Sequence, residues 1–208
     1  MVRDQADMLH DGRRAGTGRG RLRQVVLIVS TLGLSWLGMQ AVHELGHVLG
    51  AWAGGERVDR VVLHPLTISR TDASHDRHPL LVVWGGPVVG VLLPPVAFGL
   101  ARSARFRWSY LLRFFAGFCL VANGVYLGVG SFEGVGDAGD LLRHGAPGWQ
   151  LIAFGLLCVL SGLALWHGLG PHFGLGEAKG RVDGKATVAV LTLLMAFVLV
   201  ELLVGTRR

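Results

Sequence analysis

The sequence predicts an all-α polytopic membrane protein with about five transmembrane helices and a short β-hairpin or re-entrant segment after the first. Of its 208 residues, 51% are hydrophobic and 32 are glycine, a composition that suits close helix packing in lipid. Five apolar runs are long enough to cross a bilayer, at about 24–53, 79–101, 108–130, 148–166 and 186–204. Short basic flanks separate these runs, so the formal charge of +6 forms no continuous stripe and no nucleic-acid partner is expected.

Residues 1–23 precede the first apolar run and differ from it in composition. They are rich in Arg and Gly and hold little that can form a core, which predicts a disordered basic arm at the membrane surface. The apolar run that follows is too long for the apolar part of a signal peptide. Residues 24–208 are therefore expected to form a single transmembrane domain.

The end of the first apolar run carries the pattern His-x-x-x-His with a glutamate after the first histidine. His43 and His47 lie four residues apart, so on a helix they project from nearly the same face and can reach one metal ion. Glu44 can stay off the metal and act as general base on zinc-bound water. An ionisable side chain at the centre of a bilayer costs roughly 2.5 to 3.5 kcal/mol, which favours a functional site over a chance pattern of histidines that bind nothing.

This pattern supplies two ligands, whereas a catalytic zinc site usually has three from the protein. With five spans, the first and third run in the same direction, and Asp137 follows the third run. It therefore lies on the same side of the membrane as the histidines, and we predict it as the third ligand. Asp140, one helical turn further on, is the alternative, and a second alternative is that either aspartate caps a short helix.

The segment after the first run and the beginning of the second run are expected near the same site. Residues 58–71 are rich in β-branched and alternating pieces, which predicts a short strand or hairpin interrupted at Pro65. The second run contains Gly86 and Pro87. They mark either a bend beside a wet cavity or a kink with Gly86 and Gly90 as the helix contact face.

Three groups of residues together resemble a known family. They are residues 43–47 (His-Glu-Leu-Gly-His), Gly86-Pro87, and residues 137–142 (Asp-Ala-Gly-Asp-Leu-Leu). This combination resembles the site-2 protease family of intramembrane zinc metalloproteases, particularly its small core-only bacterial branch, over roughly residues 30–145. The resemblance implies that His43, His47 and Asp137 hold Zn²⁺, that Glu44 activates its water, and that the chain lies in a bacterial cell membrane.

The resemblance also implies how a substrate is bound. Residues 58–71 would correspond to the family's membrane-associated sheet, which pairs with an unwound substrate by strand addition. The family usually has Asn three residues after Gly-Pro, where this chain has Gly90, and its Asn-x-x-Pro run before the aspartate is missing. Asn123 is the candidate displaced relative. Asn123, Gly86 and Pro87 are therefore the expected substrate-binding or oxyanion residues.

The expected function is hydrolysis of peptide bonds in membrane-embedded substrates by a zinc-dependent endopeptidase. Its partners would be a membrane protein or peptide substrate and the lipid bilayer. The alternative is a non-proteolytic membrane protein that binds or transports a divalent metal. More Lys and Arg flank the spans on the side of the N-terminus, which places that side in the cytoplasm and the metal site towards the outer half, whereas the resemblance implies zinc nearer the cytoplasm.

Overall fold

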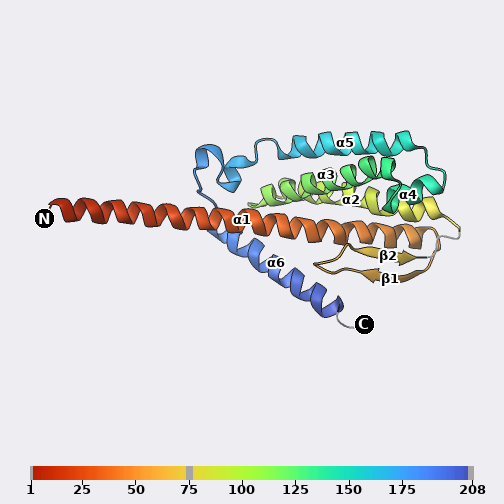
Figure 1. Ribbon diagram of the computed structural model, residues 1–208, viewed down its shortest axis with the longest axis horizontal. Helices are drawn as coiled ribbons and strands as arrows, with labels where there is room; N and C mark the ends of the chain where they lie inside the picture. The colour runs from red at the N-terminus through yellow and green to blue at the C-terminus, as the bar shows by residue number, and fades with distance from the viewer. Residues whose placement is uncertain (1, 74–76, 206–208) are drawn as a thin grey trace. The chain divides into compact units, whose positions relative to one another are not determined.

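The structure, a computed structural model, describes residues 2–73 and 77–205, with side chains for 18–73 and 77–203. It confirms the predicted fold class: helices long and apolar enough to span a membrane, joined after the first by a small antiparallel hairpin (Figure 1). The elements in chain order are α1 (Val2–Ala53), β1 (Val58–Val62), β2 (Arg70–Ala73), α2 (Pro79–Ser103), α3 (Ser109–Glu133), α4 (Gly136–Arg143), α5 (Gly148–Trp166), the 3₁₀ turns η1 (Gly170–Phe173) and η2 (Gly176–Ala178), and α6 (Gly184–Gly205).

Five of these helices, searched among the described residues, can cross a bilayer: Gly18–Ala53, Pro79–Ser103, Ser109–Glu133, Gly148–Trp166 and Gly184–Leu203. Their bounds agree closely with the predicted runs. The third is longer than predicted, because the chain leaves the helix only after Glu133. Gly124 and Gly128 in its second half remain helical and lie close to α5.

The beginning of the chain differs from the expectation. The sequence favours a disordered arm over residues 1–23, whereas α1 includes residues 2–23. Extending a formed helix costs much less than starting one, since each added residue gains a backbone hydrogen bond. The apolar span behind this segment supplies that nucleus.

The chain divides into two compact units, one made of residues up to Leu34 with Gly168–Ala196, the other of Ser35–His167 with the residues from Phe197. In the second unit, α3 packs on α5 through glycines. A Cβ added at Gly124 would lie 2.8 Å from Cβ of Cys158, and one added at Gly155 would lie 2.8 Å from the Gly124 carbonyl oxygen. Small residues let the two backbones approach closely, as is common between helices in lipid.

Helices α1 and α2 also meet backbone to backbone. A Cβ at Gly46 would lie 2.7 Å from both the Gly85 carbonyl carbon and the Gly86 Cα, and one at Gly50 would lie 2.6 Å from the Leu81 carbonyl oxygen. The contact face is therefore built on Gly46, Gly50 and Gly85. Gly86 and Gly90, the alternative contact face, also lie at close contacts: an added Cβ at Gly86 would meet the histidines of α1, and one at Gly90 would meet Asn123 of α3.

Helix α2 remains one continuous helix although it contains Pro87, Pro94 and Pro95. Each proline removes a backbone donor, a loss that membrane helices tolerate where neighbouring groups satisfy the freed carbonyl. Pro87 and Pro94 are buried in the bundle.

The hairpin lies beside the C-terminal half of α1 (Figure 1). Its strands pair antiparallel, with Arg60 opposite Asp72 and Val61 opposite Thr71. Residues 63–69 form the connection, in which the Ser69 amide donates a 2.9 Å hydrogen bond to Oε1 of Gln40 on α1. The hairpin is thus attached to the helix that carries the two histidines.

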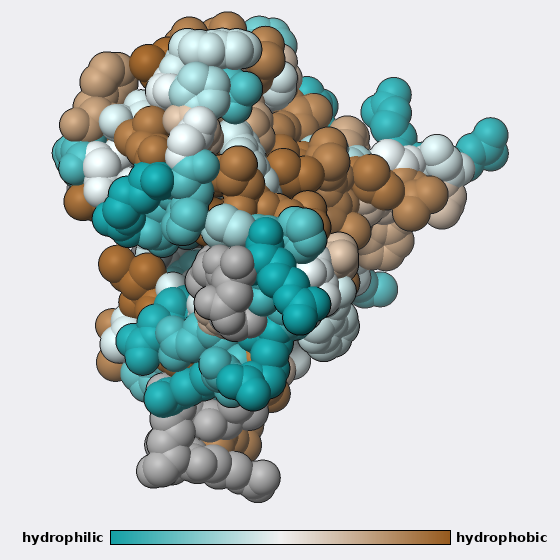
Figure 2. All heavy atoms as spheres, turned by 90° about the vertical axis from the view of Figure 1, so that its right-hand side faces the viewer, coloured by the Kyte–Doolittle hydropathy of each residue, from teal (hydrophilic) through white to brown (hydrophobic). Residues whose placement is uncertain are grey.

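The loops at this end of the second unit are polar. Figure 2 views the end at which Figure 1 draws the turns after α1 and α3, and hydrophilic side chains are prominent there beside apolar ones. Three ion pairs lie in these segments and are largely exposed: Arg57 with Asp59, Arg70 with Asp72, and Arg143 with Asp140. Such pairs contribute little to stability, but they suit a surface in contact with water.

Candidate metal centre

Two histidines on α1 form the centre of the site. His43 and His47 are each 8% exposed, and their Nε2 atoms lie 3.0 Å apart. Their rings meet edge to face, with centroids 4.7 Å apart. The spacing of four residues therefore produces the shared face that the sequence predicts.

Asp137 joins the histidines from the first turn of α4. Its Oδ2 lies 2.8 Å from Nε2 of His43 and 3.3 Å from Nε2 of His47. Helix α4 is short, but Ala138 and Leu141 are fully buried in the same apolar cluster as Leu127 of α3. This packing fixes the helix so that the Asp137 carboxylate faces α1.

The turn before α4 depends on glycine. Gly134 and Gly136 have φ angles of 66° and 56°, in the left-handed region that L side chains rarely adopt. This tight turn places the Asp137 amide 3.1 Å from the hydroxyl of Tyr126, to which it donates a hydrogen bond.

The carboxylate of Asp137 is ionised near neutral pH. Burial alone would raise the pKa of this carboxyl, but hydrogen bonding and attraction to His43 and His47 hold it well below its usual range. A charged carboxylate at this place is suited to binding a cation.

Asp140 lies outside the cluster. Its Oδ1 accepts a hydrogen bond from Arg143, and its side chain is 40% exposed. The N-cap of α4 is Val135, so neither aspartate caps that helix. Of the two predicted candidates, the structure brings only Asp137 to the histidines.

Both imidazoles are oriented through their second ring nitrogen. Nδ1 of His47 lies 2.9 Å from the Val82 carbonyl oxygen, which can only accept, so this nitrogen carries the hydrogen. Nδ1 of His43 lies 2.7 Å from Oδ1 of Asn123, whose Nδ2 donates to the Cys119 carbonyl oxygen at 2.8 Å. In neutral rings, both Nε2 lone pairs are then free to bind a metal, as metal-ligating histidines require.

The three facing atoms fit a metal ion. They all lie within 4.8 Å of one another. In a tetrahedral zinc site with bonds of about 2.0 to 2.1 Å, ligand atoms are about 3.3 Å apart, close to the distances of 2.8, 3.0 and 3.3 Å found between them. Two lone pairs and a carboxylate oxygen repel one another unless a positive charge, a proton or a metal ion, lies among them.

Gly86 keeps space open beside these atoms. A Cβ at this position would lie 2.8 Å from Nε2 of His43 and still closer to Nε2 of His47. Any side chain there would displace the imidazoles or fill the space that an ion needs. The residues present therefore fit a small divalent cation.

The Glu44 carboxylate is held by the segment that contains the hairpin, through hydrogen bonds from Ser69 and Thr71. Glu44 is 4% exposed, and each of its carboxylate oxygens accepts one hydroxyl hydrogen bond. Ser69 Oγ donates to Oε1 at 2.8 Å, and Thr71 Oγ1 donates to Oε2 at 2.7 Å. The glutamate is thus held beside the cluster and is not one of its ligands.

Sequence reasoning did not identify Gln40, Ser69 or Thr71 as part of this site. A signal was present, because Ser69 and Thr71 are two residues apart and so share one face of an extended chain. Gln40 is a polar residue in an apolar run, one helical turn before Glu44. The sequence pattern does not show that the hairpin folds back onto this turn of α1.

The residues predicted to bind substrate are all near the centre, but with different surroundings. The Asn123 amide is engaged on both sides, by His43 and by the Cys119 carbonyl, so its contacts favour a role in orienting the ligand. Gly86 faces the imidazoles, and Pro87 is buried behind it. A Cβ at Gly90 would lie 2.9 Å from both Oδ1 and Nδ2 of Asn123, so the Asn123 amide lies directly beside position 90.

Comparisons of the chain with protein-family models, with curated proteins and with solved structures find no match.

Proposed function

We propose that the protein is an intramembrane zinc-dependent endopeptidase of the site-2 protease type, acting on membrane-embedded protein or peptide substrates in a bacterial cell membrane. The observation that carries this proposal is the division of roles among four acidic and imidazole side chains. Three of them present ligand atoms to one point, while Glu44, next to a ligand in sequence, is kept off that point by hydroxyl donors. A hydrolytic metal site needs both a held ion and a separate base.

His43, His47 and Asp137 would hold the ion, and Asn123 and the Val82 carbonyl would keep the two rings in the tautomer that binds it. When bound, zinc would lower the pKa of a water ligand towards about 7 and polarise the scissile carbonyl. The open space at Gly86 lies where α2 faces the Nε2 atoms of His43 and His47.

Glu44 would accept a proton from the attacking water and return it to the leaving amine. Two hydroxyl donors hold its carboxylate in one orientation before the reaction begins, which lowers the entropy cost of proton transfer. Ser69 and Thr71 are therefore positioning residues in this mechanism. Gln40 supports them by accepting a hydrogen bond from the Ser69 amide.

The hairpin offers a means of presenting a substrate. In the two-stranded sheet, each strand pairs on one side only, so an extended peptide can add to an edge through backbone hydrogen bonds. Thr71 belongs to β2 and reaches Glu44 directly, so a peptide added beside β2 would run close to the base. A helical substrate must first unwind, because its carbonyls are engaged in intrahelical hydrogen bonds.

The test is the variant Glu44→Gln in the full chain, reconstituted in lipid vesicles with a pool of synthetic single-span peptides. Mass spectrometry of new peptide termini measures cleavage, and metal analysis of the same sample measures zinc. We expect zinc to be retained at wild-type level while cleavage falls by about 10² to 10⁴-fold, as for the loss of a general base. Glu133→Gln, which changes an exposed glutamate at the end of α3, is the matched control.

Cleavage by Glu44→Gln at the wild-type rate would refute the assignment of the base. A wild-type protein that binds zinc, cleaves nothing and admits zinc into the vesicles would favour the transport alternative instead. Within the described residues, the group that can hold a metal lies at one place, whereas a transport route needs polar groups along its length.

A further inference from the structure

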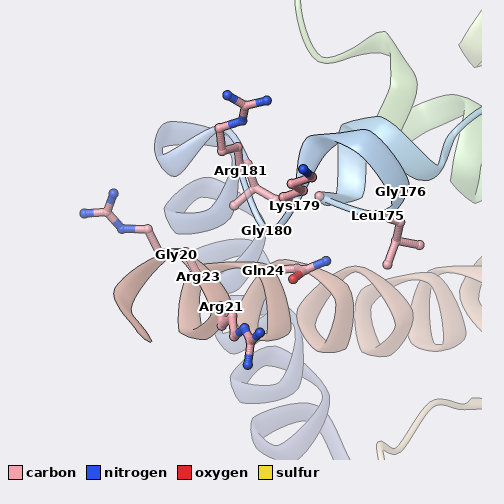
Figure 3. A pocket seen from close by; sticks show the side chains of 11 residues that line it. Gly20, Arg21, Arg23, Gln24, Leu175, Gly176, Lys179, Gly180 and Arg181 are labelled. Atoms are coloured by element: carbon pink, nitrogen blue, oxygen red, sulfur yellow. The ribbon is translucent and has the colours of Figure 1, made fainter. Parts of the chain in front are cut away.

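A second polar feature lies in the other unit, far from the metal ligands in sequence. An open pocket of about 830 Å³ is lined by residues 20–24 of α1 and by the segment between η1 and α6 (Figure 3). Four of its lining residues are cationic: Arg21, Arg23, Lys179 and Arg181. None of the described residues that line it is acidic.

The pocket is held by short contacts and is not a gap between loose segments. Nε2 of Gln24 donates a 3.0 Å hydrogen bond to the Phe173 carbonyl oxygen, which ties the segment to α1. The Gly180 amide donates to the Gly174 carbonyl oxygen at 2.8 Å, closing the loop between them. A Cβ at Gly174 would lie within 3.1 Å of both Gln24 and Gly180, so the wall has no room for a side chain there.

The positive charge of the pocket is not neutralised by a carboxylate of the residues whose side chains the structure describes. Among the described residues, no carboxylate forms an ion pair with any of the four cations. The acidic residues closest in sequence do not line the pocket, and the Asp183 carboxylate instead accepts hydrogen bonds from the amides of Lys185 and Ala186 at the start of α6. The charge remains available to an external anion.

The pocket also lies near the beginnings of two candidate spans. The first candidate span begins at Gly18 and the last at Gly184, so the lining residues 20–24 and 174–182 lie at or next to the beginnings of two spans. Both spans are odd-numbered and start on the same side of the membrane. Lipid phosphates occupy this level, and basic pockets at helix ends are known to bind anionic headgroups.

From these observations, we propose that the pocket binds a phosphate-bearing anion, supplied by the headgroup of an anionic phospholipid. Figure 3 shows the charged ends of Arg21 and Arg181 extended on opposite sides of the pocket. The charged ends point outwards, and the flexible stems of these side chains allow them to turn towards a phosphate at the opening. Arginine is suited to this task because its guanidinium donates two parallel hydrogen bonds to phosphate oxygens.

The experiment measures lipid binding to the full chain in detergent by native mass spectrometry, with added phosphatidylglycerol or phosphatidylcholine. We expect tighter binding of phosphatidylglycerol. The triple variant R21Q/R23Q/R181Q should weaken that binding on the order of 100-fold, since each basic residue near an anionic surface contributes roughly fivefold. The matched control is R102Q/R105Q/R107Q, which removes the same charge from the last turn of α2 and the connection after it, on the same side of the membrane.

Two further arms identify the source of the anion. Glycerol 3-phosphate and inorganic phosphate are added as competitors without acyl chains. Weak competition at millimolar concentration supports a phosphate site filled by lipid, whereas binding of inorganic phosphate as tight as that of the lipid supports the same site with a soluble ligand.

The proposal is overturned if neither ligand binds, or if the pocket variant and the control variant weaken lipid binding equally. The single variants R23Q and R181Q, each expected to show a partial loss, keep the test valid should the triple variant fail to fold.

Discussion

The candidate metal centre and the basic pocket differ in the burial of their charged groups and in the partners of those groups. In the metal centre, the charged and polar atoms are buried and almost every one has a partner within the chain, apart from the point at which three ligand atoms meet. In the pocket, the cations are exposed at a rim and have no carboxylate partner among the described residues. The first arrangement suits a cation and the second suits an anion.

Because of this difference, the two sites should respond differently to amino-acid substitutions. A buried site with fixed geometry depends on each atom, because a misplaced or unpaired group there cannot be rescued by water. An exposed rim depends on total charge, and each residue adds a modest, salt-sensitive increment. Single substitutions should therefore have large effects in the metal centre and small effects in the pocket.

The largest effect should follow from Asp137→Ala. Removing a ligand should weaken zinc binding by more than the 10 to 100-fold that loss of an outer partner costs, and should abolish cleavage with it. Metal analysis of the purified protein measures this directly. Asp140→Ala, which removes an exposed carboxylate three residues away, should retain zinc, and equal loss in both variants would show that Asp137 is not a ligand.

The next effect should come from Gly86→Ala, which adds one methyl group and no charge. Its Cβ would lie 2.8 Å from Nε2 of His43 and closer to His47, so the imidazoles must move or the ion is excluded. We expect zinc binding at least about tenfold weaker, with a loss of stability of roughly 1 to 3 kcal/mol from overpacking. Gly99→Ala in the same helix has nothing within 4 Å of its added Cβ and should bind zinc as the wild type does.

Smaller effects are expected from Ser69→Ala and Thr71→Val. Each removes one hydroxyl donor from Glu44, so cleavage should slow by about tenfold while zinc content stays unchanged. The effect should fall on kcat more than on KM, and Thr71→Ser should restore most of the rate. Thr67→Val, in the exposed connection, is the control; if it slows cleavage as much, the hydroxyls do not act through Glu44.

The smallest expected effect is a difference between the two sites in how strongly salt weakens ligand binding. Raising ionic strength from about 0.05 to 0.5 M should weaken phosphatidylglycerol binding at the exposed pocket several-fold, because exposed charges more than a Debye length apart are screened. Zinc binding at the buried centre should change little over the same range. Equal salt dependence of both, measured by titration in the same detergent, would remove the distinction between them.

The parts of this fold that the sequence predicts are those set by local pattern. The five spans follow from runs of apolar residues, and the shared face of His43 and His47 follows from their spacing on a helix. The place of Asp137 follows from counting spans, because alternation alone puts the ends of the first and third on one side. No knowledge of side-chain packing is needed for any of these.

What could not be predicted depends on contacts between distant segments. Asn123 was expected to bind substrate, and only the structure places its amide between His43 and the Cys119 carbonyl. The donors to Glu44 come from a hairpin whose fold onto α1 leaves no mark in the hydropathy pattern. The sequence likewise does not show that Gly86 leaves space beside the imidazoles, because this depends on which helix packs against it.

The backbone contact between α1 and α2 has one more consequence, for access from the lipid. At Gly46, Gly50 and Gly85 the two main chains touch, so no polypeptide can pass between these helices at the level of His47. This contact between α1 and α2 is therefore closed to a substrate. If the protein cleaves membrane-embedded segments as proposed, such a segment must reach the site by another route, and the hairpin, whose Thr71 donates a hydrogen bond to Glu44, lies on that route.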